Sequence, residues 1–110
     1  MIKKYLHTRF RVSDMEKSVI FYRDILGMKL TEQKTSPRGS ELVFLNFPDM
    51  NCELELCSFP GSGTVEMPED LVHLAFEVDD LEVCMHKLKA AGVPITEGPT
   101  KSSNGTRFIF

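Results

Sequence analysis

The chain has 110 residues, 42% of them hydrophobic and 26% charged, which is the balance of a single ordinary globular domain. The net charge is −3 and the Lys and Arg residues are scattered, which argues against a nucleic-acid partner or an anionic membrane surface. No apolar stretch is long enough to span a bilayer, and the first residues, MIKKYLHTRF, lack the apolar run of a signal peptide. We therefore expect a cytoplasmic protein.

The first half of the chain predicts one strand, one helix and three further strands. The opening strand is LHTRFRV, and Ser13 or Asp14 can cap the helix that follows. The apolar residues of that helix recur at three- and four-residue spacing: Met15, Val19, Tyr22 and Leu26. Gly27 comes next, where a helix often ends in a left-handed residue. The runs MKLTEQK, ELVFLNF and CELELCSF then predict strands separated by turn-forming segments.

The second half repeats this pattern. After the connection PGSGTVEMPED, the segment LVHLAFEVDDLEVCMHKLKAAGVPI predicts a strand, a capped helix ending at Gly92, and a strand. Five residues of the opening recur 66 positions later, as His7/His73, Phe10/Phe76, Val12/Val78, Asp14/Asp80 and Glu16/Glu82. The sequence thus predicts an α+β protein of two β-α-β-β-β modules, about residues 1–60 and 70–110, within one domain spanning 1–110.

The second module is expected to lack its last strand. Adding the offset of 66 to Glu55, in the fourth strand of the first module, gives position 121, which lies beyond Phe110. The last run of the chain, GTRFIF, would then be the third strand of the second module.

Side-chain alternation predicts a metal site. His7, Arg9 and Arg11 share one face of their strand, and Glu55 lies on one face of another. If the modules pack about a pseudo-two-fold axis, His7 and His73 converge, and Glu55 with its counterpart near 121 completes a set of four ligands. Such a set suits Zn²⁺, Ni²⁺, Co²⁺ or Fe²⁺. The alternative is that both histidines are ordinary polar strand residues and Glu55 lies on a solvated face.

Two arginines and three cysteines complete the candidates. Arg11 lies roughly 13 Å along the strand from His7 and is expected to hold a substrate carboxylate. Arg9 is expected to form an ion pair within the sheet, for instance with Glu53. The cysteines are odd in number and lack metal-binding spacing, so we interpret all three as small buried hydrophobic residues: Cys52, Cys57 and Cys84.

The segment LHTRFRVSDMEKSVIFYRDILGMKL closely resembles the opening of the glyoxalase I family, in the vicinal oxygen chelate superfamily. ELEL and VHLAFEVDD are similar to the second and third metal-ligand strands of that family, and the resemblance covers essentially the whole chain. It implies paired β-α-β-β-β modules around a metal cleft. It also implies that His7, Glu55 and His73 match three of four metal ligands, while the fourth, a glutamate of the last strand, lies beyond Phe110.

The resemblance implies that the chain isomerises the hemithioacetal of methylglyoxal and glutathione to S-lactoylglutathione, with Ni²⁺ or Zn²⁺, or alternatively Co²⁺, in a homodimer whose sites lie between subunits. Glu55 would then shuttle the proton, and Arg11 would hold a glutathione carboxylate. With one ligand missing, an inactive chain is one expected outcome.

One position departs from the family pattern. Phe59 stands where family members often carry an asparagine that contacts glutathione, which leaves the identity of the thiol open. Two other functions of the superfamily are weighed: a ring-cleaving Fe(II) dioxygenase, which Glu55 speaks against, and a non-catalytic protein that binds or sequesters small molecules, which the two histidines speak against.

Overall fold

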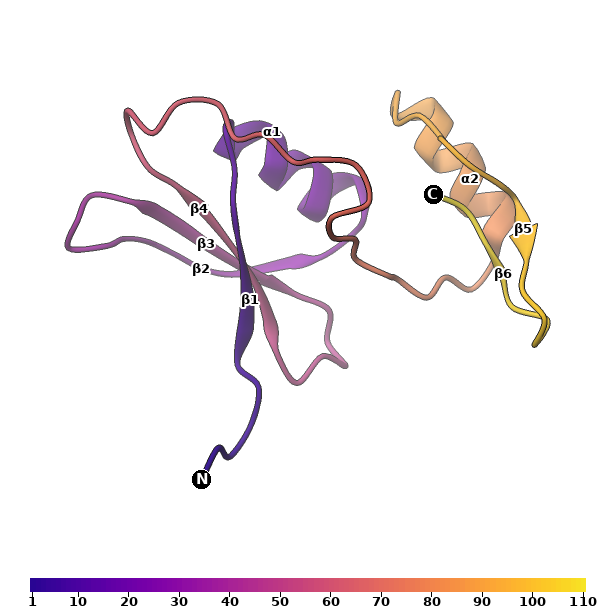
Figure 1. The fold of residues 1–110 in the computed structure, drawn as a ribbon, viewed down its shortest axis with the longest axis horizontal. Coiled ribbons are helices and arrows are strands. Elements are labelled where there is room, and N and C mark those ends of the chain that lie inside the picture. Colours follow the sequence, from indigo (N-terminus) through magenta and orange to yellow (C-terminus); the bar gives the residue numbers. More distant parts are fainter. The chain divides into compact units, whose positions relative to one another are not determined.

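The chain divides into two compact units, residues 1–68 and 69–110, in a computed structural model that describes all 110 residues (Figure 1). The first unit contains a four-stranded sheet and a helical segment, and the second contains a helix and a two-stranded sheet. This mixed α+β composition confirms the predicted fold class. None of the helices is both long enough and apolar enough to cross a membrane.

The first unit has the predicted β-α-β-β-β order. Its elements are β1 (His7–Arg11), α1 (Met15–Val19), η1 (Ile20–Ile25), β2 (Lys29–Thr35), β3 (Glu41–Asn46) and β4 (Glu53–Ser58). The order of strands in the sheet is β1-β4-β3-β2. Strands β1 and β4 are parallel, whereas β4, β3 and β2 form an antiparallel meander. The first and last strands of the unit are therefore neighbours, although about 40 residues separate them in the sequence.

The first helical segment begins at a capping aspartate. The Asp14 side chain accepts a hydrogen bond from the Lys17 backbone N–H at 3.0 Å, which satisfies one of the unpaired donors of the first turn. The segment starts as the α-helix α1 but continues as the π-helix η1, in which the Leu26 N–H bonds to the Phe21 carbonyl at 2.9 Å. Gly27 ends the segment with a φ of +83°, a conformation that glycine adopts at least cost.

Both faces of the sheet bury hydrophobic side chains. The larger cluster comprises Met28, Val43, Leu45, Leu54 and Leu56. Three of the predicted apolar helix residues, Met15, Val19 and Tyr22, pack against it, so the helical segment covers this face. The opposite face buries a smaller cluster made of Leu42, Phe44 and Cys57. Glu55 lies on that second face, and it is the buried charged residue of the chain.

The second unit repeats the capping geometry of the first. Its helix α2 (Leu81–Ala90) begins at Asp80, whose side chain accepts a hydrogen bond from the Val83 N–H at 3.0 Å. The helix is followed by Gly92, with a φ of +76°. Strands β5 (Thr100–Lys101) and β6 (Arg107–Phe108) then form an antiparallel hairpin. The two capping aspartates are 66 residues apart, which is the offset of the predicted repeat.

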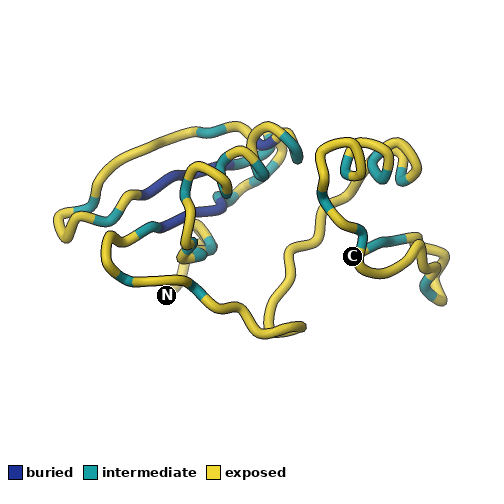
Figure 2. The backbone as a smooth tube through the Cα atoms, turned by 90° about the horizontal axis from the view of Figure 1, so that it is seen from above, coloured by how far each residue is buried: buried dark blue, intermediate teal, exposed yellow.

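The segment 71–78 differs from its prediction, because it forms no strand in this structure. In the first unit, the equivalent strand β1 is hydrogen-bonded to β4. In the second unit the only strand pairing is between β5 and β6, so segment 71–78 has no hydrogen-bonded strand beside it. Figure 2 shows the consequence, since the buried positions all lie in the first unit and segment 71–78 is exposed.

Candidate metal site

The site is centred on Glu55, in the middle of β4. Its register neighbours are Arg9 of β1 on one side and Phe44 of β3 on the other. Only 1% of Glu55 is exposed, and it shares its face of the sheet with the buried Phe44 and Cys57. Because a charged group loses its hydration when it is buried, a carboxylate in this position needs charged or hydrogen-bonding partners. The partners of its two oxygens therefore decide what the site can do.

The first oxygen is bound by Arg9. The Arg9 Nη2 atom donates a hydrogen bond to Glu55 Oε1 at 2.9 Å. This hydrogen bond, followed by the attraction of the negative charge, raises the pKa of Arg9 above its usual value. The expected ion pair of Arg9 within the sheet is confirmed, but its partner is Glu55 rather than Glu53, because the parallel register places Arg9 beside Glu55. Glu53 instead accepts a hydrogen bond from the Thr31 hydroxyl.

The second oxygen faces His7. The distance from His7 Nε2 to Glu55 Oε2 is 3.0 Å, but the two atoms do not form a hydrogen bond, and the buried Oε2 has no hydrogen-bond partner. The His7 ring lies edge-on to the Phe44 ring, with 5.9 Å between the centroids, which limits its orientation. An imidazole nitrogen and a carboxylate oxygen at this separation form an ion pair when the histidine is protonated, and a neutral imidazole with a carboxylate can bind a common cation. His7 Nε2 and Glu55 Oε2 are therefore placed to supply two of the ligands that a divalent metal ion would need.

The remaining predicted site residues lie elsewhere. Arg11 is exposed on the same face of β1 as His7, beside Cys57 in the register. His73 belongs to the second unit, where its ring lies edge-on to the Phe110 ring at 5.7 Å. No group of three or more His, Cys, Asp or Glu side chains that could hold a metal ion is present in the structure. Of the three predicted ligands, the first unit brings His7 and Glu55 together, whereas His73 belongs to the second unit.

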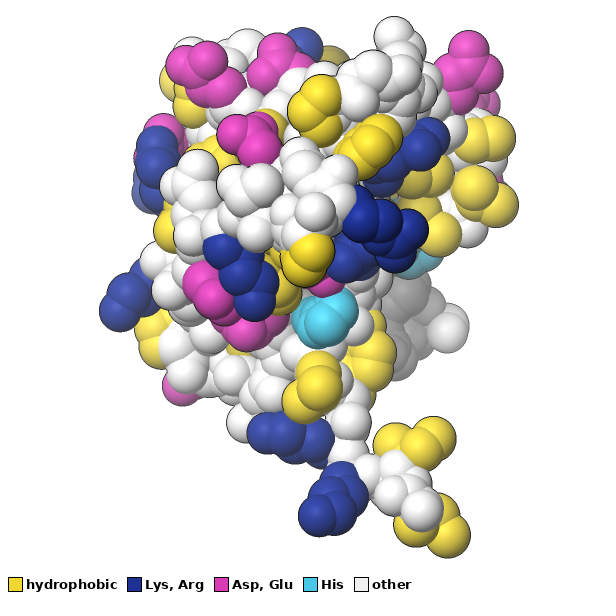
Figure 3. All heavy atoms as spheres, turned by 90° about the vertical axis from the view of Figure 1, so that its left-hand side faces the viewer, with side chains coloured by type: hydrophobic (Ala, Val, Ile, Leu, Met, Phe, Trp, Pro, Cys, Tyr) yellow, Lys and Arg dark blue, Asp and Glu magenta, His cyan; other side chains and the backbone are white.

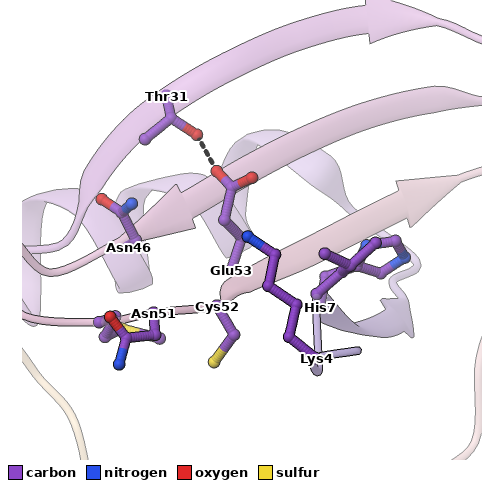
Figure 4. A pocket seen from close by; sticks show the side chains of 9 residues that line it. Lys4, His7, Thr31, Asn46, Asn51, Cys52 and Glu53 are labelled. Carbon is purple, nitrogen blue, oxygen red and sulfur yellow. Dashed lines mark hydrogen bonds between the residues drawn. The ribbon is translucent and has the colours of Figure 1, made fainter. Parts of the chain in front are cut away.

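An open cleft of about 510 Å³ begins beside His7. Polar side chains line much of it, including Lys4, Thr31, Asn46, Asn51 and Glu53 (Figure 4). The cleft could not be predicted from the sequence, because its walls come from β2, β3 and the turn before β4, which only strand pairing brings together. The dashed line in Figure 4 marks the hydrogen bond between Thr31 and Glu53 that closes one side.

The structure confirms the prediction for one of the three cysteines. Cys57 is buried, as expected, whereas Cys52 and Cys84 are half-buried, and all three are free thiols. Cys52 lines the cleft beside His7 rather than filling a core position. On the face in Figure 3, basic side chains are interspersed with acidic and hydrophobic ones, so that face carries no extended basic patch.

Comparison with known proteins identifies the family. Residues 4–110 match the sequence profile of the glyoxalase/bleomycin resistance protein/dioxygenase superfamily. The chain belongs to this superfamily. It is 33% identical over 107 residues to a probable lactoylglutathione lyase of Synechocystis, an alignment that covers 94% of this chain and 82% of that protein. The predicted resemblance to the glyoxalase I family is confirmed.

Solved structures of the superfamily have the same fold. The trypanothione-dependent glyoxalase I of Leishmania major superposes with a TM-score of 0.78 at 30% identity, covering 98% of this chain and 78% of that one. An antibiotic-binding protein of a Streptomyces strain superposes with a TM-score of 0.72 at 24% identity, covering 94% of this chain and 82% of that one. This second similarity concerns the fold alone. The superfamily fold therefore occurs both in glyoxalase I enzymes and in a protein that binds an antibiotic.

Proposed function

We propose that the chain is an isomerase of the glyoxalase I type, which converts the hemithioacetal of methylglyoxal and glutathione to S-lactoylglutathione in the cytoplasm. The observation that carries this proposal is the buried Glu55 carboxylate, whose unpartnered Oε2 lies 3.0 Å from His7 Nε2. The similarity to a probable lactoylglutathione lyase and to a glyoxalase I supports the same activity.

In this proposal, a divalent cation such as Ni²⁺ or Zn²⁺ is held by His7 and Glu55 of the first unit together with His73 of the second. When bound, the ion would stabilise the negative charge that develops on the substrate oxygens. Glu55 takes the proton from one carbon of the substrate and returns it to the adjacent carbon. Because Arg9 occupies Oε1, the same Oε2 atom would serve in turn as metal ligand and as proton acceptor. Arg11, exposed on the same strand face, would hold a carboxylate of the thiol.

The proposal includes a homodimer in which the two units complete one domain and its sites lie between subunits. Residues 69–110 contain no buried position. Five large apolar side chains of segment 71–78 are exposed: Leu71, Val72, Leu74, Phe76 and Val78. Exposed apolar side chains in such a run are typical of a surface that another protein surface covers. His73 belongs to the same segment, so we propose that ordering this segment in the dimer would also fix the position of the third ligand.

The identity of the thiol co-substrate depends on the position of Phe59. Phe59 follows β4 and is exposed, at the position where an asparagine would contact glutathione. The test is to follow thioester formation from methylglyoxal with glutathione, and in parallel with trypanothione, after adding Ni²⁺ or Zn²⁺. We expect a rate above the spontaneous one that is lost in Glu55→Gln. A rate equal to the spontaneous one with both thiols and both metals would refute the proposed isomerase.

A second candidate function is the non-catalytic binding of a small molecule. It is favoured by the ion pair between Arg9 and Glu55, which satisfies the buried charge without a metal ion. In that case the protein would bind methylglyoxal adducts or other small molecules without producing thioester. Equilibrium binding in the absence of any turnover would separate this function from the isomerase.

A further inference from the structure

We propose that Arg9 is a positioning residue that serves as a built-in counter-ion of Glu55 and competes with the divalent cation for it. This inference rests on the proposed function, because it concerns the affinity of the same site for its metal. It predicts that removing the arginine raises the affinity for the metal ion and lowers the stability of the metal-free protein.

Arg9 engages one of the two Glu55 carboxylate oxygens. Arg9 Nη2 donates to Oε1 of Glu55 at 2.9 Å, while Oε2 is the oxygen that lies 3.0 Å from His7 Nε2. A carboxylate whose Oε1 is engaged by a guanidinium offers a cation one oxygen rather than two. Arg9 therefore sets both which oxygen faces His7 and how the carboxylate can bind a metal ion.

The positive charge of Arg9 opposes the binding of a cation to Glu55. The arginine guanidinium keeps its positive charge at every pH at which a protein is folded. The Arg9–Glu55 pair is neutral as a whole, so an incoming divalent cation meets a carboxylate whose charge is already balanced. Glu55 is buried, so its interactions with charges are screened less than in water, although the 55% exposure of Arg9 reduces the repulsion between the guanidinium and the cation. The arginine consequently lowers the affinity for the metal ion while it stabilises the protein without one.

The Arg9–Glu55 pair differs in burial from the Arg23–Asp24 and Arg107–Glu82 pairs. In the Arg23–Asp24 pair the side chains are 46% and 50% exposed, and in the Arg107–Glu82 pair 50% and 60%. Water screens such pairs, which contribute little. In the Arg9–Glu55 pair the carboxylate side chain is only 2% exposed, although the arginine is 55% exposed. Glu55 thus depends on Arg9 for its charge balance, whereas Arg9 can reach water.

The experiment compares wild-type protein with Arg9→Met, which has a similar length without the charge, and with Arg9→Lys, which keeps the charge. Arg11→Met is the matched control, because it removes the same charge from the same strand face without touching the hydrogen bond to Glu55. Ni²⁺ affinity is measured by calorimetric titration of the full chain. Thermal unfolding is recorded separately in the presence of a chelator.

We expect Arg9→Met to bind Ni²⁺ about tenfold more tightly than wild type or more, and Arg9→Lys and Arg11→Met to change the affinity less. In chelator, Arg9→Met is expected to unfold at a lower temperature than wild type. Equal or weaker Ni²⁺ binding by Arg9→Met overturns the inference, as does equally tight binding by Arg9→Lys and Arg9→Met. If neither wild type nor Arg9→Met binds Ni²⁺, the proposed metal site itself is wrong and this inference fails with it. Binding of equal strength by both overturns this inference alone.

Discussion

The coupling between Arg9 and Glu55 can be measured in the metal-free protein with a double-mutant cycle. Arg9→Met leaves a carboxylate that is 1% exposed without its charged partner. Removing one partner of a fully buried ion pair costs roughly 3–5 kcal/mol, because the remaining charge stays buried. Since the Arg9 side chain is 55% exposed and water screens it, we expect a smaller loss, about 2 kcal/mol of unfolding free energy.

Glu55→Gln is expected to cost less than Arg9→Met. The amide oxygen of glutamine can accept the same hydrogen bond from Arg9, and no charge is left buried, so the expected loss is about 0.5–1 kcal/mol. The double variant should then resemble Glu55→Gln alone, because the methionine no longer leaves a charge unpaired. The coupling energy between the two positions then equals the loss in Arg9→Met alone, about 2 kcal/mol.

The assay is urea unfolding in chelator, followed by far-ultraviolet circular dichroism, because the chain has no tryptophan whose fluorescence could report on unfolding. The decisive comparison is between the two single variants, which differ in whether a buried charge remains. Free-energy changes that add to within about 0.5 kcal/mol in the double variant would refute the reasoning, as would a loss in Arg9→Met no larger than that in Glu55→Gln.

Three further predictions concern the helix caps, the core and the thiol. Asp14→Ala and Asp80→Ala each remove a hydrogen bond to an N-terminal helix N–H, and each is expected to lower the unfolding free energy by about 1 kcal/mol in urea titrations. Leu45→Ala, at a position with no exposed surface, should cost about 2–5 kcal/mol in the same assay, and a loss below 1 kcal/mol would contradict the assigned core. Phe59→Asn is expected to lower the KM for the glutathione hemithioacetal in steady-state assays, and an unchanged KM would remove this position from the thiol site.

Much of the fold was predictable because it depends on local chemistry repeated along the chain. Asp14 and Asp80 cap their helices with the same backbone conformation, and Gly27 and Gly92 both have positive φ angles. Each of these features is set by neighbouring residues, so the sequence alone predicts it. The repeat of 66 residues also predicted a second capped helix followed by a glycine, which the structure has at Asp80 and Gly92.

What could not be predicted depends on strand pairing. Alternation places Glu55 and Arg9 on predictable faces of their strands, but it does not give the register between β1 and β4, and the register decides that Arg9 meets Glu55 rather than Glu53. For the same reason the cleft beside His7 was missed. Segment 71–78 has the residue pattern of a strand, yet it forms none here, because a strand also needs a hydrogen-bonded neighbour.

The central claim is that His7, Glu55 and His73 are ligands of one divalent metal ion. The most direct test is calorimetric titration of Ni²⁺ into wild type, His7→Ala and His73→Ala, with His86→Ala as the control, because His86 is an exposed histidine of α2 that takes no part in the proposed site. We predict that wild type and His86→Ala bind with equal affinity. His7→Ala and His73→Ala should each lower the Ni²⁺ affinity by more than the roughly 10–100-fold that is typical when a residue hydrogen-bonded to a metal ligand is removed. Unchanged Ni²⁺ affinity in His7→Ala would contradict the account.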